Sequence, residues 1–125
     1  MEKTKNTKAR KKMRITIELD SEKEILVMSC VSSALASLTY GIGYWADVRD
    51  ASPSNPAICF VRERETSSGK PGQWLPLRRA DIERGLARMA LTAPKIFGRI
   101  FDDNGDAPAG DILIQYALLG EERYG

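Results

Sequence analysis

The run of acidic residues at 102–106 is the stretch whose residue types come nearest to a metal site. Its sequence is Asp-Asp-Asn-Gly-Asp, and Asp and Asn side chains are ordinary Ca²⁺ ligands in EF-hand loops. A loop counted from Asp102 would need Gly at its sixth position and Glu at its twelfth, where this chain has Ala107 and Leu113. The spacing therefore indicates a turn, and we expect neither a metal ion nor a cofactor.

This chain has few residues that could serve in acid–base or nucleophilic catalysis. The sequence contains no histidine, which excludes serine or cysteine nucleophiles activated by histidine and the usual zinc sites of mixed histidine and cysteine ligands. Asp47 and Asp50 are three residues apart in an expected strand or turn, so their carboxylates are not expected to converge. With no other acid–base pair in view, the sequence predicts a non-enzymatic protein without catalytic residues.

The segment Gly41–Ala46 combines two glycines with two large aromatic side chains. The glycines do not fit the dinucleotide-binding fingerprint, because they follow a helical pattern and the third glycine is absent. Tyr44 and Trp45, together with Trp74, either stack on a partner or pack in the core, and both alternatives stay open. A nucleotide held against Tyr44 or Trp45 would make the protein a small nucleotide-binding sponge.

Arginine and tryptophan recur between residues 62 and 79. Both residue types are enriched among the side chains that dominate protein interfaces. Glu63 and Glu65 alternate with the first two arginines, so a solvated hairpin of mixed charge is the alternative. The expected macromolecule-binding residues are Tyr44, Trp45, Arg62, Arg64, Trp74, Arg78 and Arg79.

The first twelve residues form a basic head on a mildly acidic body. They hold six basic residues and one acidic residue, a net charge of +5, which leaves 13 basic and 16 acidic residues, a net charge of −3, on the rest. So polar a segment is expected to be disordered in isolation, either as a nucleic-acid-binding arm or as a solvated tail, with Met13 as an alternative start. The candidate nucleic-acid-binding residues are Lys3, Lys5, Lys8, Arg10, Lys11 and Lys12, assisted by Lys70, Arg78 and Arg79.

Hydrophobic periodicity predicts one α+β domain over residues 13–125. Strands are expected at 13–19, 44–49, 57–65 and 73–77, the third ending in a projecting hairpin and the last at a sheet edge because Pro76 lacks an amide donor. Helices are expected at about 22–38, from 79 or 80 until Pro94, at 95–101 and at 110–119, with a Ser21–Glu24 capping box and Gly120 as a C-terminal stop. The order is β-α-β-β-β-α-α-α, which favours a small antiparallel sheet with helices packed on one face.

Composition and cysteine usage favour a cytoplasmic protein. The chain is 42% hydrophobic and 29% charged, which is ordinary for a globular domain. No apolar run approaches the ~20 residues that span a membrane, so no membrane association is expected. Cys30 and Cys59 lie in apolar contexts that are typical of reduced core cysteines, and a disulfide between them is the alternative.

Three segments give the chain a resemblance to small accessory proteins of bacteriophages, prophages and mobile elements. They are Gly41–Ala46, Ala80–Leu86, and Gly110–Glu121 with the final Tyr124-Gly125. The resemblance implies a protein made in the cytoplasm of a host bacterial cell that acts by binding host defence complexes, nucleic acid or signalling nucleotides. It brings no assigned chemistry with it.

The leading hypothesis is therefore a non-enzymatic accessory protein that binds a host macromolecule, namely a host protein or ribonucleoprotein complex. An anti-CRISPR-like inhibitor of a host defence system is one version of it. The alternatives are a nucleic-acid-binding protein that uses the basic head and the nucleotide sponge. A homodimer through the edge strand at Trp74 or through the last helix is a further alternative.

Overall fold

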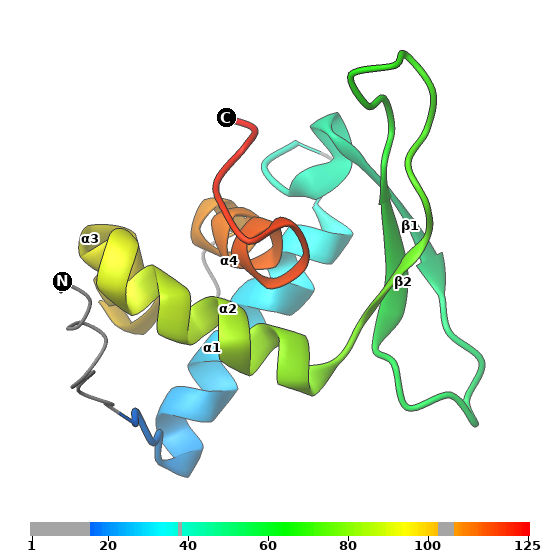
Figure 1. Cartoon of the computed structure of the whole chain (residues 1–125). Coiled ribbons are helices and arrows are strands. Elements are labelled where there is room, and N and C mark those ends of the chain that lie inside the picture. Colours follow the sequence, from blue (N-terminus) through cyan, green and yellow to red (C-terminus); the bar gives the residue numbers. More distant parts are fainter. Residues whose placement is uncertain (1–15, 38, 103–106) are drawn as a thin grey trace, which may run out of the picture.

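The computed structural model describes residues 16–37, 39–102 and 107–125, which form four α-helices, one short 3₁₀ helix and a three-stranded antiparallel sheet (Figure 1). This arrangement confirms the expected α+β class. The basic head and residues 103–106 of the acidic run lie outside the described residues. The elements are α1 (Ser21–Ala36), η2 (Ile42–Tyr44), β1 (Ala46–Asp50), β2 (Cys59–Glu63), β3 (Leu75–Leu77), α2 (Arg79–Thr92), α3 (Pro94–Asp102) and α4 (Ala107–Leu119).

Helix α4 is the centre of the helical layer, and α1, α2 and α3 all pack against it. A helix that is apolar almost all round belongs in a core, and most of α4 is buried. Two glycines bring the neighbouring backbones close to it. A Cβ at Gly110 would lie 2.0 Å from the carbonyl oxygen of Cys30 in α1, and one at Gly85 would lie 2.6 Å from the backbone nitrogen of Ala117.

The strand expected at 13–19 is not found in its described part, because residues 16–19 form no strand. Leu19 instead packs on the helical core, beside the helices α1 and α2. Alternating apolar and polar residues show that one side of a segment is buried, but they do not show whether it is buried against a strand or against helices. The cap of α1 also lies one residue earlier than predicted, since Asp20 accepts a hydrogen bond from the Lys23 amide at 3.0 Å.

Strand β2 lies between β1 and β3, with Val48 opposite Val61 and Phe60 opposite Pro76. Strand β3 is therefore an edge strand, which confirms the prediction from Pro76. The helices lie on one side of the sheet, as expected (Figure 1). Cys59, Val61 and Leu77 are buried, whereas the alternate positions along the strands look away from the helices.

The connection from β2 to β3 extends as a long arm beyond the body of the molecule (Figure 1), as the sequence predicted. Its tip is closed by hydrogen bonds from the Thr66 amide to the Lys70 carbonyl and from the Gly69 amide to the Thr66 carbonyl, both at 2.8 Å. Gly69 adopts a φ of 81° there, in the left-handed region that favours glycine. At the end of α4, Gly120 has a φ of 79° and is the predicted C-terminal stop.

Candidate functional site

Trp45 is part of the core and cannot contribute to a binding surface, which corrects its assignment as a macromolecule-binding residue. Only 4% of the residue is exposed. Its ring stacks on that of Tyr124 with 5.1 Å between centroids and 8° between planes. The strand predicted from residue 44 begins only at Ala46, because Ile42–Tyr44 form a 3₁₀ turn that directs the indole inward.

Asp111 of α4 is the acceptor that holds this aromatic segment. Its Oδ1 accepts hydrogen bonds from Trp45 Nε1 at 2.8 Å and from Gln115 Nε2 at 3.0 Å, and its Oδ2 accepts from the Tyr44 hydroxyl at 2.7 Å. Burial and the neighbouring Asp111 carboxylate raise the pKa of Tyr44, because both disfavour the phenolate. The helix expected at 110–119 puts Asp111 in its first turn, where an acidic side chain is favourable without any tertiary partner, so nothing in the sequence indicated this network.

Gln115 extends the same network to the last residues of the chain. Its Oε1 accepts from the amides of Arg123 and Tyr124 at 2.7 and 2.8 Å, and its Nε2 donates to the Tyr124 carbonyl at 3.1 Å. Tyr124 in turn donates its hydroxyl to Glu63 on β2. The polar groups of this network are therefore satisfied by one another within the protein. The network holds the final segment on the sheet and leaves few polar groups to bind a substrate.

The face of the sheet that looks away from the helices carries a cluster of arginine and aromatic side chains. Arg49 and Arg62 each place the guanidinium carbon 4.6 Å from the centroid of the Trp74 ring, and Arg49 also lies 5.2 Å from the Phe60 ring centroid. Such cation–π contacts restrain long side chains that would otherwise move freely. We call this surface the arginine–tryptophan face; its residues are Asp47, Arg49, Phe60, Arg62, Arg64 and Trp74.

The arginine–tryptophan face carries more positive than negative charge. Asp47 is its one carboxylate, and its two oxygens accept from Nε of Arg62 at 3.1 Å and from Nε of Arg64 at 3.2 Å. Arg49 forms no ion pair within the described part of the chain. Three guanidinium groups against one carboxylate leave a local net charge of +2 on an open surface.

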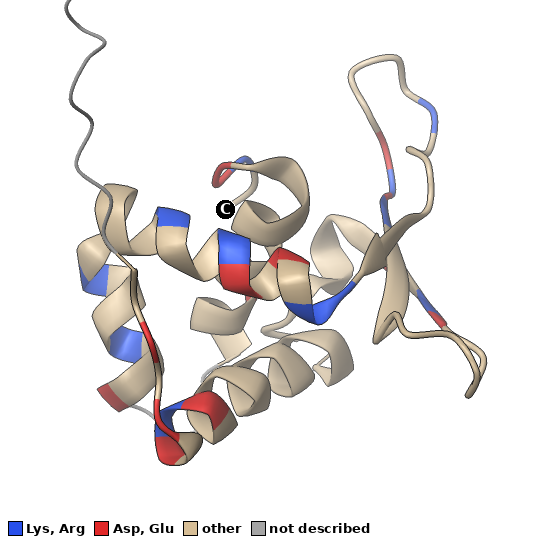
Figure 2. Ribbon diagram, turned by 60° about the horizontal axis from the view of Figure 1, so that its bottom comes forward, with Lys and Arg blue, Asp and Glu red and all other residues tan. Residues whose placement is uncertain are grey.

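The other predicted arginines do not join this face. Arg79 of α2 is held by Glu24 at 2.8 Å and by Glu83 at 3.3 Å, and the hydrogen bond that Arg79 donates to Glu24 raises the pKa of Arg79. Arg78 precedes α2, and its backbone amide donates to Asp81 at 2.8 Å. Lys70 lies at the tip of the β2–β3 arm, and the lysines and arginine of the head are outside the described residues. Lys and Arg are spread over α2, α3, the sheet and its arm rather than forming one stripe (Figure 2).

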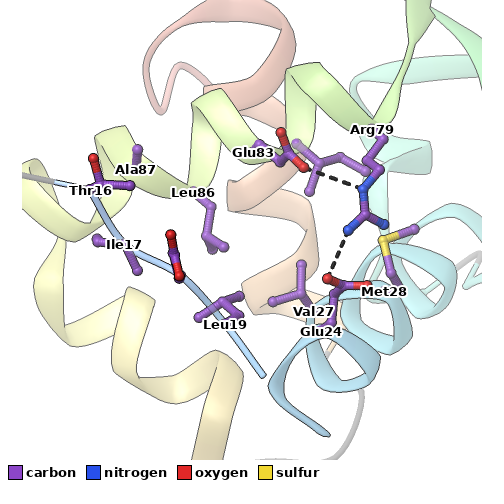
Figure 3. Close-up of a pocket in the computed structure, with 12 residues that line it drawn as sticks. Thr16, Ile17, Leu19, Glu24, Val27, Met28, Arg79, Glu83, Leu86 and Ala87 are labelled. Carbon is purple, nitrogen blue, oxygen red and sulfur yellow. Dashed lines mark ion pairs between the residues drawn. The ribbon is translucent and has the colours of Figure 1, made fainter. Parts of the chain in front are cut away.

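A cavity of about 580 Å³ lies between α1, α2 and residues 16–19 (Figure 3). Its wall is apolar, with Val27, Leu86 and Leu19 pointing into it. At its rim Arg79 sits between two carboxylates, so its charge is already compensated (Figure 3). A ligand site usually adds a few convergent polar groups to an apolar wall, and here the one lining cation among the described residues, Arg79, is already engaged by Glu24 and Glu83. We therefore favour the arginine–tryptophan face over this cavity.

Both cysteines are buried and no disulfide joins them, and burial raises the pKa of the Cys59 thiol to about 11. A thiol that loses its proton near pH 9 in the unfolded chain and near pH 11 in the folded protein keeps more protons in the native state between these values. The free energy of unfolding should therefore fall as pH rises from 9. We expect urea unfolding of the reduced protein to show this fall between pH 9 and 11, and Cys59→Ala to reduce its slope. An unchanged slope in the variant would contradict this assignment.

Among the described residues no group of His, Cys, Asp and Glu side chains is placed to hold a metal ion, and none of the described helices has the length and apolar character to cross a membrane. Comparison of the chain with protein-family models, curated protein sequences and solved structures finds no significant match. Function must therefore be inferred from the residues and geometry of this chain.

Proposed function

We propose that this protein is a non-enzymatic binding protein that docks a negatively charged surface of a macromolecule on its arginine–tryptophan face. The observation that carries the proposal is the local charge of this face, which holds three arginines and the single carboxylate of Asp47. Arg49 and Arg62 lie over the Trp74 ring, Arg62 and Arg64 pair with Asp47, and no described helix covers this side of the sheet. Arginine and tryptophan are the side chains most often found to dominate binding energy at interfaces.

The cation–π contacts add to this proposal because they order the surface before a partner arrives. Fixing a flexible side chain on binding costs about 0.5–1.5 kcal/mol. Arg49 and Arg62 are already held over the Trp74 ring, so part of this cost is met in the free protein. A face prepared in this way suits recognition better than catalysis, for which it offers no nucleophile.

The resemblance to phage and mobile-element accessory proteins supplies the biological setting of the proposal. In that setting the protein acts in the cytoplasm of a host bacterial cell, and its partner is a host protein or ribonucleoprotein complex. Inhibition of a host defence system, as by an anti-CRISPR protein, is the specific version. The nucleotide sponge is less favoured, because the burial of Trp45 removes one of its two stacking rings.

The test is a pull-down from bacterial lysate with the tagged full-length protein and two charge-reversal variants. Arg49→Glu should reduce partner recovery at least about tenfold, since it removes a contact and adds a repulsion. Arg88→Glu is the matched control, because Arg88 is an exposed arginine of α2 without an ion pair among the described residues. Equal recovery with both variants, or no stoichiometric partner for the unmodified protein, would overturn the proposal. Circular dichroism confirms that both variants are folded.

A further inference from the structure

Resting on the proposed function, we infer that the partner group recognised by the arginine–tryptophan face is the phosphate backbone of a single-stranded nucleic acid. The inference begins with the guanidinium atoms that remain free. Asp47 engages Arg62 and Arg64 through Nε alone, and no terminal nitrogen of either side chain has a hydrogen bond within the described residues. Within the described part of the chain, the partners of the Arg49 guanidinium are the rings of Phe60 and Trp74. The paired terminal nitrogens, which match the oxygens of a phosphate, are thus available on all three arginines.

The spacing of the arginines follows from the strand geometry. Arg62 is on β2 and Arg64 directly follows Glu63, the last residue of that strand, and both side chains reach the Asp47 carboxylate. Arg49 lies on the neighbouring strand opposite Phe60, one step back along the same face. The three positions therefore form a row along the direction of the strands, with the side chains of Arg49 and Arg62 converging on Trp74. A row suits the repeating phosphates of an extended single strand better than a single carboxylate of a protein partner.

The acidic residues nearby do not oppose such a ligand. Glu63 lies between Arg62 and Arg64 in sequence, but alternation places it on the other face of β2. There it pairs with Arg123 at 3.3 Å and accepts from the Tyr124 hydroxyl. Among the described residues that define the arginine–tryptophan face, Asp47 is the one carboxylate, and its charge is shared by two arginines.

The aromatic side chains supply the second element of single-strand recognition. Trp74 and Phe60 are half-buried on this face, and guanidinium planes stacked on a ring also present a flat surface on which bases stack. A duplex exposes only the edges of its bases in its grooves, whereas a single strand can bring both its phosphates and the flat faces of its bases into contact with this surface. The observations therefore favour single-stranded nucleic acid over an acidic protein surface.

Fluorescence anisotropy with a short labelled oligothymidylate and oligouridylate tests the inference on the full chain. Arg49→Glu should weaken binding about tenfold and lower the dependence of the logarithm of affinity on the logarithm of salt concentration by about one, between 50 and 200 mM salt. Arg88→Glu should weaken binding less than about twofold, because Arg88 is not on this face. Oligonucleotide should also quench tryptophan fluorescence, and Trp74→Phe should abolish the quenching because Trp45 is buried.

The outcomes separate this inference from the proposed function. Binding that is equal for the unmodified protein and Arg49→Glu, or binding without Trp74-dependent quenching, would assign the affinity to another basic segment and overturn the inference. Absence of oligonucleotide binding together with a nuclease-resistant protein partner that Arg49→Glu loses would overturn the inference and leave the proposed function standing. Absence of both interactions would overturn both.

Discussion

Gly110→Ala is expected to destabilise the protein by about 3 kcal/mol or more, at the upper end of the cost of overpacking a core. The new methyl carbon would lie 2.0 Å from the carbonyl oxygen of Cys30 and 3.0 Å from the Cβ of Ala34. The nearest atom belongs to the backbone of α1, so no side chain can rotate away to make room. Helices α1 and α4 would have to move apart, which loosens the packing on both.

A matched glycine in α3 provides the control for this prediction. A Cβ at Gly98 meets no atom within 4 Å. Gly98→Ala should therefore stabilise the protein by about 0.5–1 kcal/mol, because alanine loses less backbone entropy in a helix than glycine does. Urea unfolding followed by circular dichroism measures both variants. If Gly110→Ala unfolds at the same urea concentration as the unmodified protein, the close crossing of α1 and α4 is wrong.

Asp111→Ala should be the second strongly destabilising substitution, at a cost of about 2–4 kcal/mol. It removes the shared acceptor of Trp45, Gln115 and Tyr44. The Tyr44 hydroxyl can turn to water, because that residue is 53% exposed. The indole N–H and the Gln115 amide are buried, and each unsatisfied buried polar group costs about 1–3 kcal/mol.

Asp111→Asn tests whether the hydrogen bonds of Asp111, rather than its charge, carry this effect. Asparagine keeps one oxygen for Trp45 and Gln115, and its amide can donate to the Tyr44 hydroxyl, which also accepts. We expect less than half the loss seen with alanine, and a smaller change in the intrinsic fluorescence that reports on Trp45. Denaturant titrations of the two variants give the comparison. Equal losses would mean that this network contributes through charge alone.

The order of the elements could largely be predicted from the sequence, because local signals set it. Pro76 marked an edge strand, Gly120 marked the end of α4, and the apolar periodicity located all four helices. The strand prediction was wrong at residues 16–19, because alternating apolar and polar residues indicate burial of one side and do not identify the neighbouring element. The assignment of Trp45 to a binding surface was wrong for a related reason. An aromatic residue beside glycines suits either a surface or a core, and its burial depends on a hydrogen bond to Asp111, which is distant in sequence.

Part of the candidate site could be predicted from the sequence. Arg62, Arg64 and Trp74 were expected as a binding rim, and the structure brings these three to one face of the sheet. Arg79 was grouped with them by nearness in sequence, but α2 carries it toward Glu24. Arg49 was missed because its place depends on strand register, which a single sequence does not give. The available signal was that Arg49 is two residues from Asp47 in an expected strand, which puts both side chains on the same face of the sheet.

The central position of α4 has a consequence for synthesis of the protein. Helices α1 and α2 leave the ribosome before α4, yet both bury their apolar faces largely against it. At about 5–20 residues per second, the interval between the end of α1 and the completion of α4 lasts several seconds. During this time the nascent chain exposes unpartnered apolar surface, which is the kind of segment that chaperones bind. Folding of this core is therefore expected to follow the translation of α4 rather than to accompany that of α1 and α2.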